Sequence, residues 1–182
     1  KYTNTVCSRG PERSAQRNFG VSISRGKYVL IIDSDMQLSK HVIEQCIDSV
    51  SDKSCAIIIP EESFGIGFWA RCKTLERSFY NGVEWIEAPR FFSKNTYERV
   101  GGYNEKMVGG EDWDLHDRVK DVTKVSRISA VIHHDEGSLS LREIYTSRKY
   151  YTKGFSTHFF NNEKPKKNNK SGASQAFSVY FL

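Results

Sequence analysis

The stretch that decides the fold is GKYVLIIDSD, residues 26–35. Its first part, residues 27–32, is a short apolar run that is rich in β-branched side chains and is followed at once by acidic residues. Such a run is typical of a strand buried on both faces of a parallel sheet. Asp33 and Asp35 stand two positions apart at its end, where an extended chain would turn both side chains to the same side.

Two carboxylates this close together repel each other unless a cation lies between them. Mg²⁺ or Mn²⁺ would supply that charge and accepts oxygen ligands. Open α/β sheets bind ligands at the carboxyl ends of their strands. Asp33 and Asp35 are therefore a candidate site for a divalent cation, and the structural alternative is that they only cap the next helix.

Strands and helices alternate along the rest of the chain. Hydrophobic periodicity and turn residues predict strands at 1–6, 27–32, 55–59, 88–93 and 125–132, and helices at 11–25, 39–50, 68–80, 96–100, 111–119 and 138–153. This alternation predicts an α/β domain with a mostly parallel sheet and flanking helices.

Three local expectations accompany these predicted elements. Ser39 is a suitable N-cap for the second helix. That helix would bury one face made of Val42, Ile43, Cys46, Ile47 and Val50. Gly65 and Gly67 are expected to lie in a loop.

Composition limits the function classes. A chain of 182 residues is long enough for one domain with a sizeable core. Its net charge of +5 comes largely from lysines between residues 161 and 172, a polar stretch that we interpret as a solvated linker. A nucleic-acid contact there is the alternative, but no basic stripe crosses the rest of the chain, so we expect no nucleic-acid partner.

The hydropathy and the cysteine pattern of the sequence predict a cytoplasmic protein. No stretch approaches the roughly 20 apolar residues of a membrane span. The four cysteines form no C-x-x-C pair, which favours structural thiols in a reducing compartment.

Two further groups of residues are candidates for chemistry. Glu111 and Asp112 follow a glycine-rich loop and begin a predicted helix, where the helix dipole favours acids even without a function. His133 and His134 end a predicted strand beside two more acids. A histidine in that position binds a metal or has a purely structural role.

Taken in order, these segments resemble glycosyltransferase family 2. Residues 14–20, 26–28 and 33–35 resemble its A-x-R-N-x-G helix, G-x-Y strand and D-x-D motif, and residues 90–92, 101–105 and 110–115 resemble its later glycine loop and acidic motif. His133 and His134 fall where GT-A enzymes often carry a metal-binding histidine. The resemblance extends over residues 7–153, and the ordered set is far more specific than one D-x-D.

The resemblance implies a GT-A fold and metal-dependent, inverting transfer of a sugar from a nucleotide-diphosphate donor to an acceptor hydroxyl. Asp112 would be the general base and Glu111 a supporting residue. Mn²⁺ or Mg²⁺ would be held by Asp35 and one histidine, with His134 preferred over His133. Asp33 would contact the donor ribose or join the metal shell.

The resemblance also implies roles around the donor and acceptor. Arg17 and Asn18 would stabilise the loop around the diphosphate. The acceptor would be a growing polysaccharide or other glycan, a lipid carrier or a protein glycan. Aromatic and basic residues at 142–160 would suit an acceptor-side or membrane-proximal surface, and we expect peripheral association with the cytoplasmic face of a membrane.

Family members normally begin with a strand-helix-strand unit that holds the nucleotide base, and no counterpart precedes Lys1. Residues 1–160 are therefore expected to be a GT-A catalytic domain without its start, and residues 161–182 a basic linker and C-terminal segment. The main alternative is a non-catalytic GT-A remnant that binds a nucleotide or sugar. A metal-dependent phosphohydrolase would need more ligands than this sequence offers.

Overall fold

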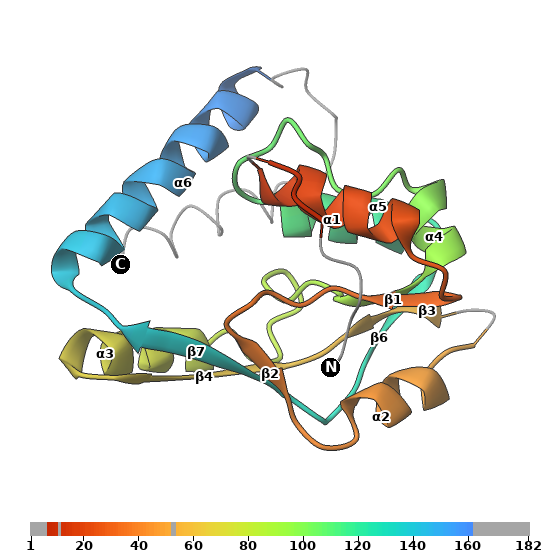
Figure 1. Ribbon diagram of the computed structural model, residues 1–182, viewed down its shortest axis with the longest axis horizontal. Helices are drawn as coiled ribbons and strands as arrows, with labels where there is room; N and C mark the ends of the chain where they lie inside the picture. Colours follow the sequence, from red (N-terminus) through yellow and green to blue (C-terminus); the bar gives the residue numbers. More distant parts are fainter. Residues whose placement is uncertain (1–6, 11, 52–53, 162–182) are drawn as a thin grey trace.

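The structure is a computed structural model that describes residues 7–10, 12–51 and 54–161 (Figure 1). The predicted strand at 1–6 and the basic run at 164–170 lie outside the described residues. The helices are α1 (Arg13–Ile23), α2 (Val42–Asp48), α3 (Phe68–Ser78), α4 (Lys94–Arg99), α5 (Glu111–Lys120) and α6 (Leu141–Asn161). The strands are β1 (Tyr28–Leu30), β2 (Met36–Leu38), β3 (Ser54–Ile58), β4 (Glu61–Ile66), β5 (Phe91–Ser93), β6 (Lys124–Arg127) and β7 (Ile132–Ser138).

The described strands form two sheets, in the orders β1-β5-β3-β6 and β2-β7-β4. Only the β3–β6 and β4–β7 pairings among them are parallel, while β1–β5, β3–β5 and β2–β7 are antiparallel. The α/β class is confirmed, but the prediction of a mostly parallel sheet is wrong for this part of the chain. The reason is that β5 lies between β1 and β3 and runs antiparallel to both. The hydrophobic periodicity of a strand does not indicate its direction in the sheet.

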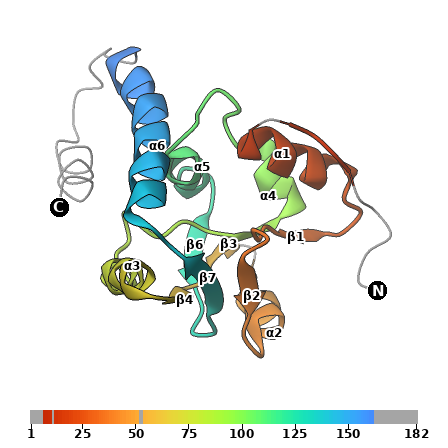
Figure 2. The same ribbon diagram turned by 60° about the vertical axis from the view of Figure 1, so that its left-hand side comes forward.

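Helices cover both faces of the four-stranded sheet, with α1, α4 and α5 on one side and α2 on the other (Figures 1 and 2). Phe91 and Phe92 show how β5 serves both sides, because neighbouring side chains of a strand point to opposite faces. Phe92 packs with buried residues of α1, α4 and α5. Phe91 packs with Val42 and Cys46 of α2.

Strand β1 lies at the edge of the described four-stranded sheet, whereas its apolar run predicted a strand buried on both faces. It pairs with β5 alone among the described strands and does not lie at the centre of the sheet. Only Val29 of its three residues is buried. The strand predicted at 27–32 also ends early, because Ile31 is followed by exposed Ile32 and a turn at Ser34 and Asp35.

The three-stranded sheet is largely absent from the sequence prediction. β2 and β4 were not predicted, and Gly65, expected in a loop, lies in β4. The strand predicted at 125–132 covers most of β6 and only the first residue of β7, so that His133 and His134 lie inside β7. Gly65 lies within β4. A glycine suits this position because α3 packs closely against it, and a Cβ there would lie 2.8 Å from the Cβ of Ala70.

Helix α2 is shorter than predicted and begins differently. Its N-cap is His41, with a left-handed φ of 69°, and the Ser39 hydroxyl instead accepts a hydrogen bond from the backbone N–H of Val131. Val42 and Cys46 are buried as predicted, but Ile43 and Ile47 are exposed. None of the helices among the described residues combines the length and the apolar character that crossing a membrane requires.

The two-sided core predicts a clear stability difference between two phenylalanines. Phe92→Ala removes a fully buried ring from the larger cluster and should lower the free energy of unfolding by about 3–5 kcal/mol. Phe79→Ala, at the exposed end of α3, should change it by about 0.5 kcal/mol or less. Denaturant unfolding measures both, and equal losses would contradict the described core.

Candidate functional site

Arg17 of α1 lies at the centre of the candidate site. Its Nη2 donates to Asp33 Oδ1 at 2.8 Å and to Asp33 Oδ2 at 3.1 Å. Its Nη1 lies 3.2 Å from Asp112 Oδ1 and 3.5 Å from Glu111 Oε1. One guanidinium therefore joins the D-x-D segment to the acidic motif at the start of α5.

The surroundings keep Arg17 charged although its side chain is only 7% exposed. Burial by itself would lower the pKa of Arg17, but the charge of Asp112 and the hydrogen bond to Asp33 raise it above its ordinary value. The guanidinium also lies over the Tyr103 ring, 5.0 Å from the ring centroid.

Asp33 is held by two arginines. Besides the two bonds from Arg17, its Oδ2 lies 3.5 Å from Arg90 Nη1. Burial would raise the pKa of Asp33, but the hydrogen bond from Arg17 and the charges of Arg17 and Arg90 lower it below its ordinary value. Asp33 is therefore an ionised anchor with both carboxylate oxygens engaged.

Asp35 points to a different part of the site. The backbone turns after Asp33, with the N–H of Met36 bonded to the Asp33 carbonyl, so the expectation that both acids share one side of an extended chain is wrong. The turn directs Asp35 to β7, where its Oδ2 lies 3.3 Å from His134 Nε2.

The two histidines lie on opposite faces of β7. His134 faces inward, is 11% exposed and lies beside Asp35. His133 faces outward, is 41% exposed and lies 3.9 Å from Glu62. The structure brings only His134 together with the other predicted site residues.

Glu61, the first residue of β4, belongs to the site although the sequence analysis did not single it out. Its Oε1 accepts from Arg90 Nε at 2.6 Å, and its Oε2 lies 3.4 Å from His134 Nδ1. Burial would raise the pKa of Glu61, but the contacts with His134, Arg90 and Arg77 lower it to about 2. The signal was present, since only Pro60 separates Glu61 from the end of the strand predicted at 55–59, and Asp33 likewise comes just after a predicted strand.

The two acids at the start of α5 have different environments. Glu111 is 3% exposed and accepts from Arg13 Nη2 at 2.8 Å. Burial, and then the charge of Asp112, raises the pKa of Glu111 above its ordinary value. Asp112 is 37% exposed, so it is the carboxylate of the pair that a second molecule can reach.

Asn18 connects α1 to the glycine loop before α5. Its Oδ1 accepts from the Tyr97 hydroxyl at 2.7 Å and from the backbone N–H of Tyr103 at 2.9 Å, and its Nδ2 donates to the Tyr103 carbonyl at 2.9 Å. Gly102 makes this approach possible, because its φ is +65° and a Cβ would lie 2.5 Å from Asn18 Oδ1.

The comparisons with known proteins bear on this arrangement. The model of the family described as Glycosyl transferase family 2 matches residues 6–104, more than half of the chain. The chain belongs to glycosyltransferase family 2. The match includes Arg17, Asn18, Asp33 and Asp35 and ends before Glu111. Family membership and the mixed α/β architecture confirm the GT-A fold class.

Among solved structures, the chain is similar to the crystal structure of TarS from S. aureus, with 13% identity and a TM-score of 0.45. The alignment covers 73% of this chain and 25% of the TarS chain, so the chain spans about a quarter of the length of TarS. No curated protein matches the chain.

Asp35 and His134 are the residues of this family 2 chain that fit a divalent cation. Ligands of Mg²⁺ at about 2.1 Å in octahedral geometry lie about 3 Å apart, which suits the 3.3 Å between Asp35 Oδ2 and His134 Nε2. The described residues hold no set of three or more His, Cys, Asp or Glu side chains suited to a metal. Water and substrate phosphate would complete the shell, as is usual for Mg²⁺.

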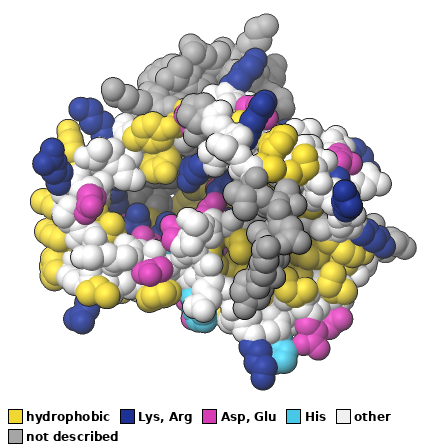
Figure 3. Space-filling model, viewed as in Figure 1, with side chains coloured by type: hydrophobic (Ala, Val, Ile, Leu, Met, Phe, Trp, Pro, Cys, Tyr) yellow, Lys and Arg dark blue, Asp and Glu magenta, His cyan; other side chains and the backbone are white. Residues whose placement is uncertain are grey.

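The surface of the molecule has a hollow beside α6. Figure 3 shows it between α6 and the rest of the molecule, with acidic and basic side chains at its edge. Helix α6 contacts two other helices. Arg148 pairs with Glu76 of α3 at 2.9 Å, and the ring of Tyr151 lies against the guanidinium of Arg13 of α1.

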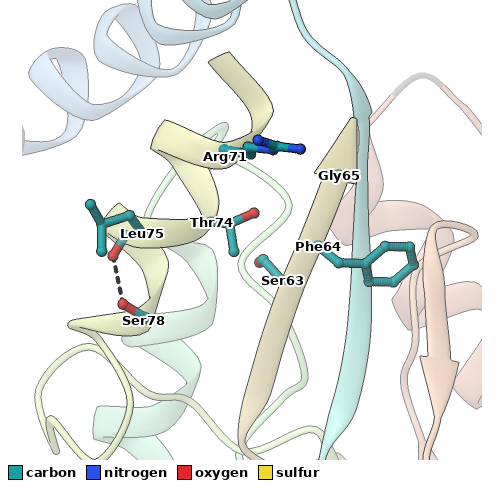
Figure 4. A pocket seen from close by; sticks show the side chains of 7 residues that line it. All are labelled: Ser63, Phe64, Gly65, Arg71, Thr74, Leu75 and Ser78. Carbon is teal, nitrogen blue, oxygen red and sulfur yellow. Dashed lines mark hydrogen bonds between the residues drawn. The ribbon is translucent and has the colours of Figure 1, made fainter. Parts of the chain in front are cut away.

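A second, open cavity of about 410 Å³ lies between β4 and α3 (Figure 4). It is lined by Ser63, Phe64, Gly65, Arg71, Thr74, Leu75 and Ser78. None of these is a member of the candidate site, so the site is not part of this cavity.

Asn18 offers a test of how the site is held together. Asn18→Ala would leave the backbone N–H of Tyr103 and the Tyr97 hydroxyl without their acceptor, at a cost of about 1–3 kcal/mol for each buried group. We expect a loss of about 2–4 kcal/mol in unfolding free energy. Asn95→Ala, at an exposed position of α4, is the matched control, and an equal effect of the two changes would show that Asn18 is not a structural link.

Proposed function

We propose that this chain is part of an enzyme that transfers a sugar, of the hexosyl type, from a nucleotide-diphosphate donor to an acceptor hydroxyl with inversion. The observation that carries the proposal is the placement of Arg17 between Asp33 and Asp112. It holds the D-x-D segment, associated with the donor, at a fixed distance from the acid assigned to the acceptor. A single displacement needs both substrates held in that way.

Asp112 is the proposed general base. Its Oδ1 lies 3.2 Å from Arg17 Nη1 and its side chain is 37% exposed, so it can take the proton of an acceptor hydroxyl as that oxygen attacks the anomeric carbon. Such a base contributes about 10²–10⁴-fold to the rate. Glu111 is buried against Arg13 and Arg17 and is proposed to support the start of α5.

Asp35 and His134 are proposed to hold Mn²⁺ or Mg²⁺ beside the donor diphosphate. Such a cation, when bound, supplies Lewis-acid stabilisation of the charge on the leaving nucleoside diphosphate. Asp33, two residues before Asp35, keeps its contacts with Arg17 and Arg90, and its proposed further contact is with the donor ribose. Arg17 and Asn18 then fix the backbone around the diphosphate.

The acceptor is proposed to approach Asp112 from the exposed side of its carboxylate, since Asp112 is the accessible acid at the start of α5. A glycan, a lipid carrier and a protein glycan all present the hydroxyl that this chemistry needs. The cytoplasmic location and the peripheral membrane association inferred from the sequence remain predictions.

The role of Asp112 is tested by Asp112→Asn in the full protein. Transfer should fall by about 10²–10⁴-fold while donor binding is retained, because the amide keeps the shape but accepts no proton. The control is Asp114→Asn on the same helix, where the carboxylate pairs with Arg118 at 2.6 Å. Equal turnover in the two variants would remove Asp112 from the mechanism.

The cation site is tested by chelation and by the two neighbouring histidines. Excess chelator should abolish transfer, and Mn²⁺ should restore it. His134→Gln should raise the Mn²⁺ concentration needed for half-maximal rate by about 10-fold or more, since it removes a proposed ligand. His133→Gln, on the other face of β7, should leave it unchanged. Full activity in chelator would overturn the assignment.

A further inference from the structure

Glu61 lies beside His134 on the inner face of the small sheet. β4 and β7 run parallel, with Ser63 opposite His134 and Glu61 opposite Ile132. The alternation of β4 turns Glu61 and Ser63 inward and leaves Glu62 and Phe64 exposed. Glu61 and Glu62 are therefore chemically identical neighbours on opposite faces, each beside a different histidine.

The ring of His134 lies between two carboxylates. Its Nε2 is 3.3 Å from Asp35 Oδ2, and its Nδ1 is 3.4 Å from Glu61 Oε2. A histidine that binds a metal through one nitrogen usually donates the N–H of the other to a carboxylate, which fixes the tautomer and the ring orientation. The arrangement around His134 has the parts of such a pair.

Arg77 of α3 competes for the same nitrogen. Its Nη1 lies 3.2 Å from His134 Nδ1 and can only donate, which favours the opposite tautomer, with the proton on Nε2. A cation beside Nε2 excludes that proton, so the ring must then carry it on Nδ1. Arg77 can give up this contact because its Nε also bonds Glu136 Oε1 at 2.7 Å.

We propose that Glu61 is a positioning residue that accepts a hydrogen bond from the Nδ1–H of His134 in the cation-bound protein and so keeps Nε2 turned to Asp35. Glu61 is itself fixed, because Arg90 Nε donates to its other oxygen at 2.6 Å. This inference rests on the proposed function, since it requires that Asp35 and His134 share a divalent cation.

The test compares Mn²⁺ binding by wild type, Glu61→Gln, Glu62→Gln and Asp35→Asn in the full protein, followed by electron paramagnetic resonance of free Mn²⁺. Glutamine keeps an oxygen for Arg90 but carries no charge toward the ring. Glu61→Gln should therefore weaken Mn²⁺ binding by about 10–100-fold, the usual effect of losing such a partner. Glu62→Gln should bind as wild type does, because it faces His133.

The outcomes separate this inference from the proposed function. Weak binding by Asp35→Asn together with wild-type binding by Glu61→Gln would overturn the role of Glu61 alone. Identical titrations of wild type and Asp35→Asn would show that there is no shared cation, and would overturn the cation assignment and this inference together.

The tautomer of His134 is a measurement that a purely structural role of Glu61 would not change. Long-range ¹H–¹⁵N spectra of the Mg²⁺-loaded protein should show the His134 proton on Nδ1. A proton on Nε2 in that state would overturn the proposal even if Glu61→Gln lost affinity. Melting temperatures of Glu61→Gln and Glu62→Gln identify any affinity loss that comes from unfolding, and Glu61→Asp, which keeps the charge, should recover part of the affinity.

Discussion

The candidate site depends on one buried positive charge, the guanidinium of Arg17. An arginine with a side chain only 7% exposed is stable only where carboxylates surround it. Asp33, Asp112 and Glu111 supply that charge from two segments far apart in the sequence. Because all three carboxylates pair with one guanidinium, this interaction joins α1, the segment that follows β1 and the start of α5.

A second chain of ion pairs extends from Asp33 into the small sheet. Arg90 lies near both Asp33 and Glu61, Glu61 lies beside His134, and His134 lies beside Asp35. This continuity explains why the polar face of β4 and β7 is turned inward. It also explains why the turn after Asp33 matters, since the turn directs Asp35 to the histidine while Asp33 remains with the arginines.

Local sequence patterns predicted the helices better than the sheets. The apolar periodicity of α3 and the glycine stop before α5 need only neighbouring residues, so both were found within a few positions. β4 and β7 were missed or merged because their inward residues, Glu61 and His134, are polar. A strand whose buried face is satisfied by ion pairs lacks the alternation of apolar and polar residues that identifies a half-buried strand.

The sequence by itself determined the residue types, their order and the family, because the motifs around Arg17, Asp33 and Asp112 are short and local. Only the tertiary structure decided which of them meet. Arg17 and Asp112 are joined by folding over a long stretch of chain, and His134 rather than His133 meets Asp35 because neighbouring residues of β7 face opposite sides of the sheet. Register and turn geometry depend on distant pairing partners, and no local pattern contains them.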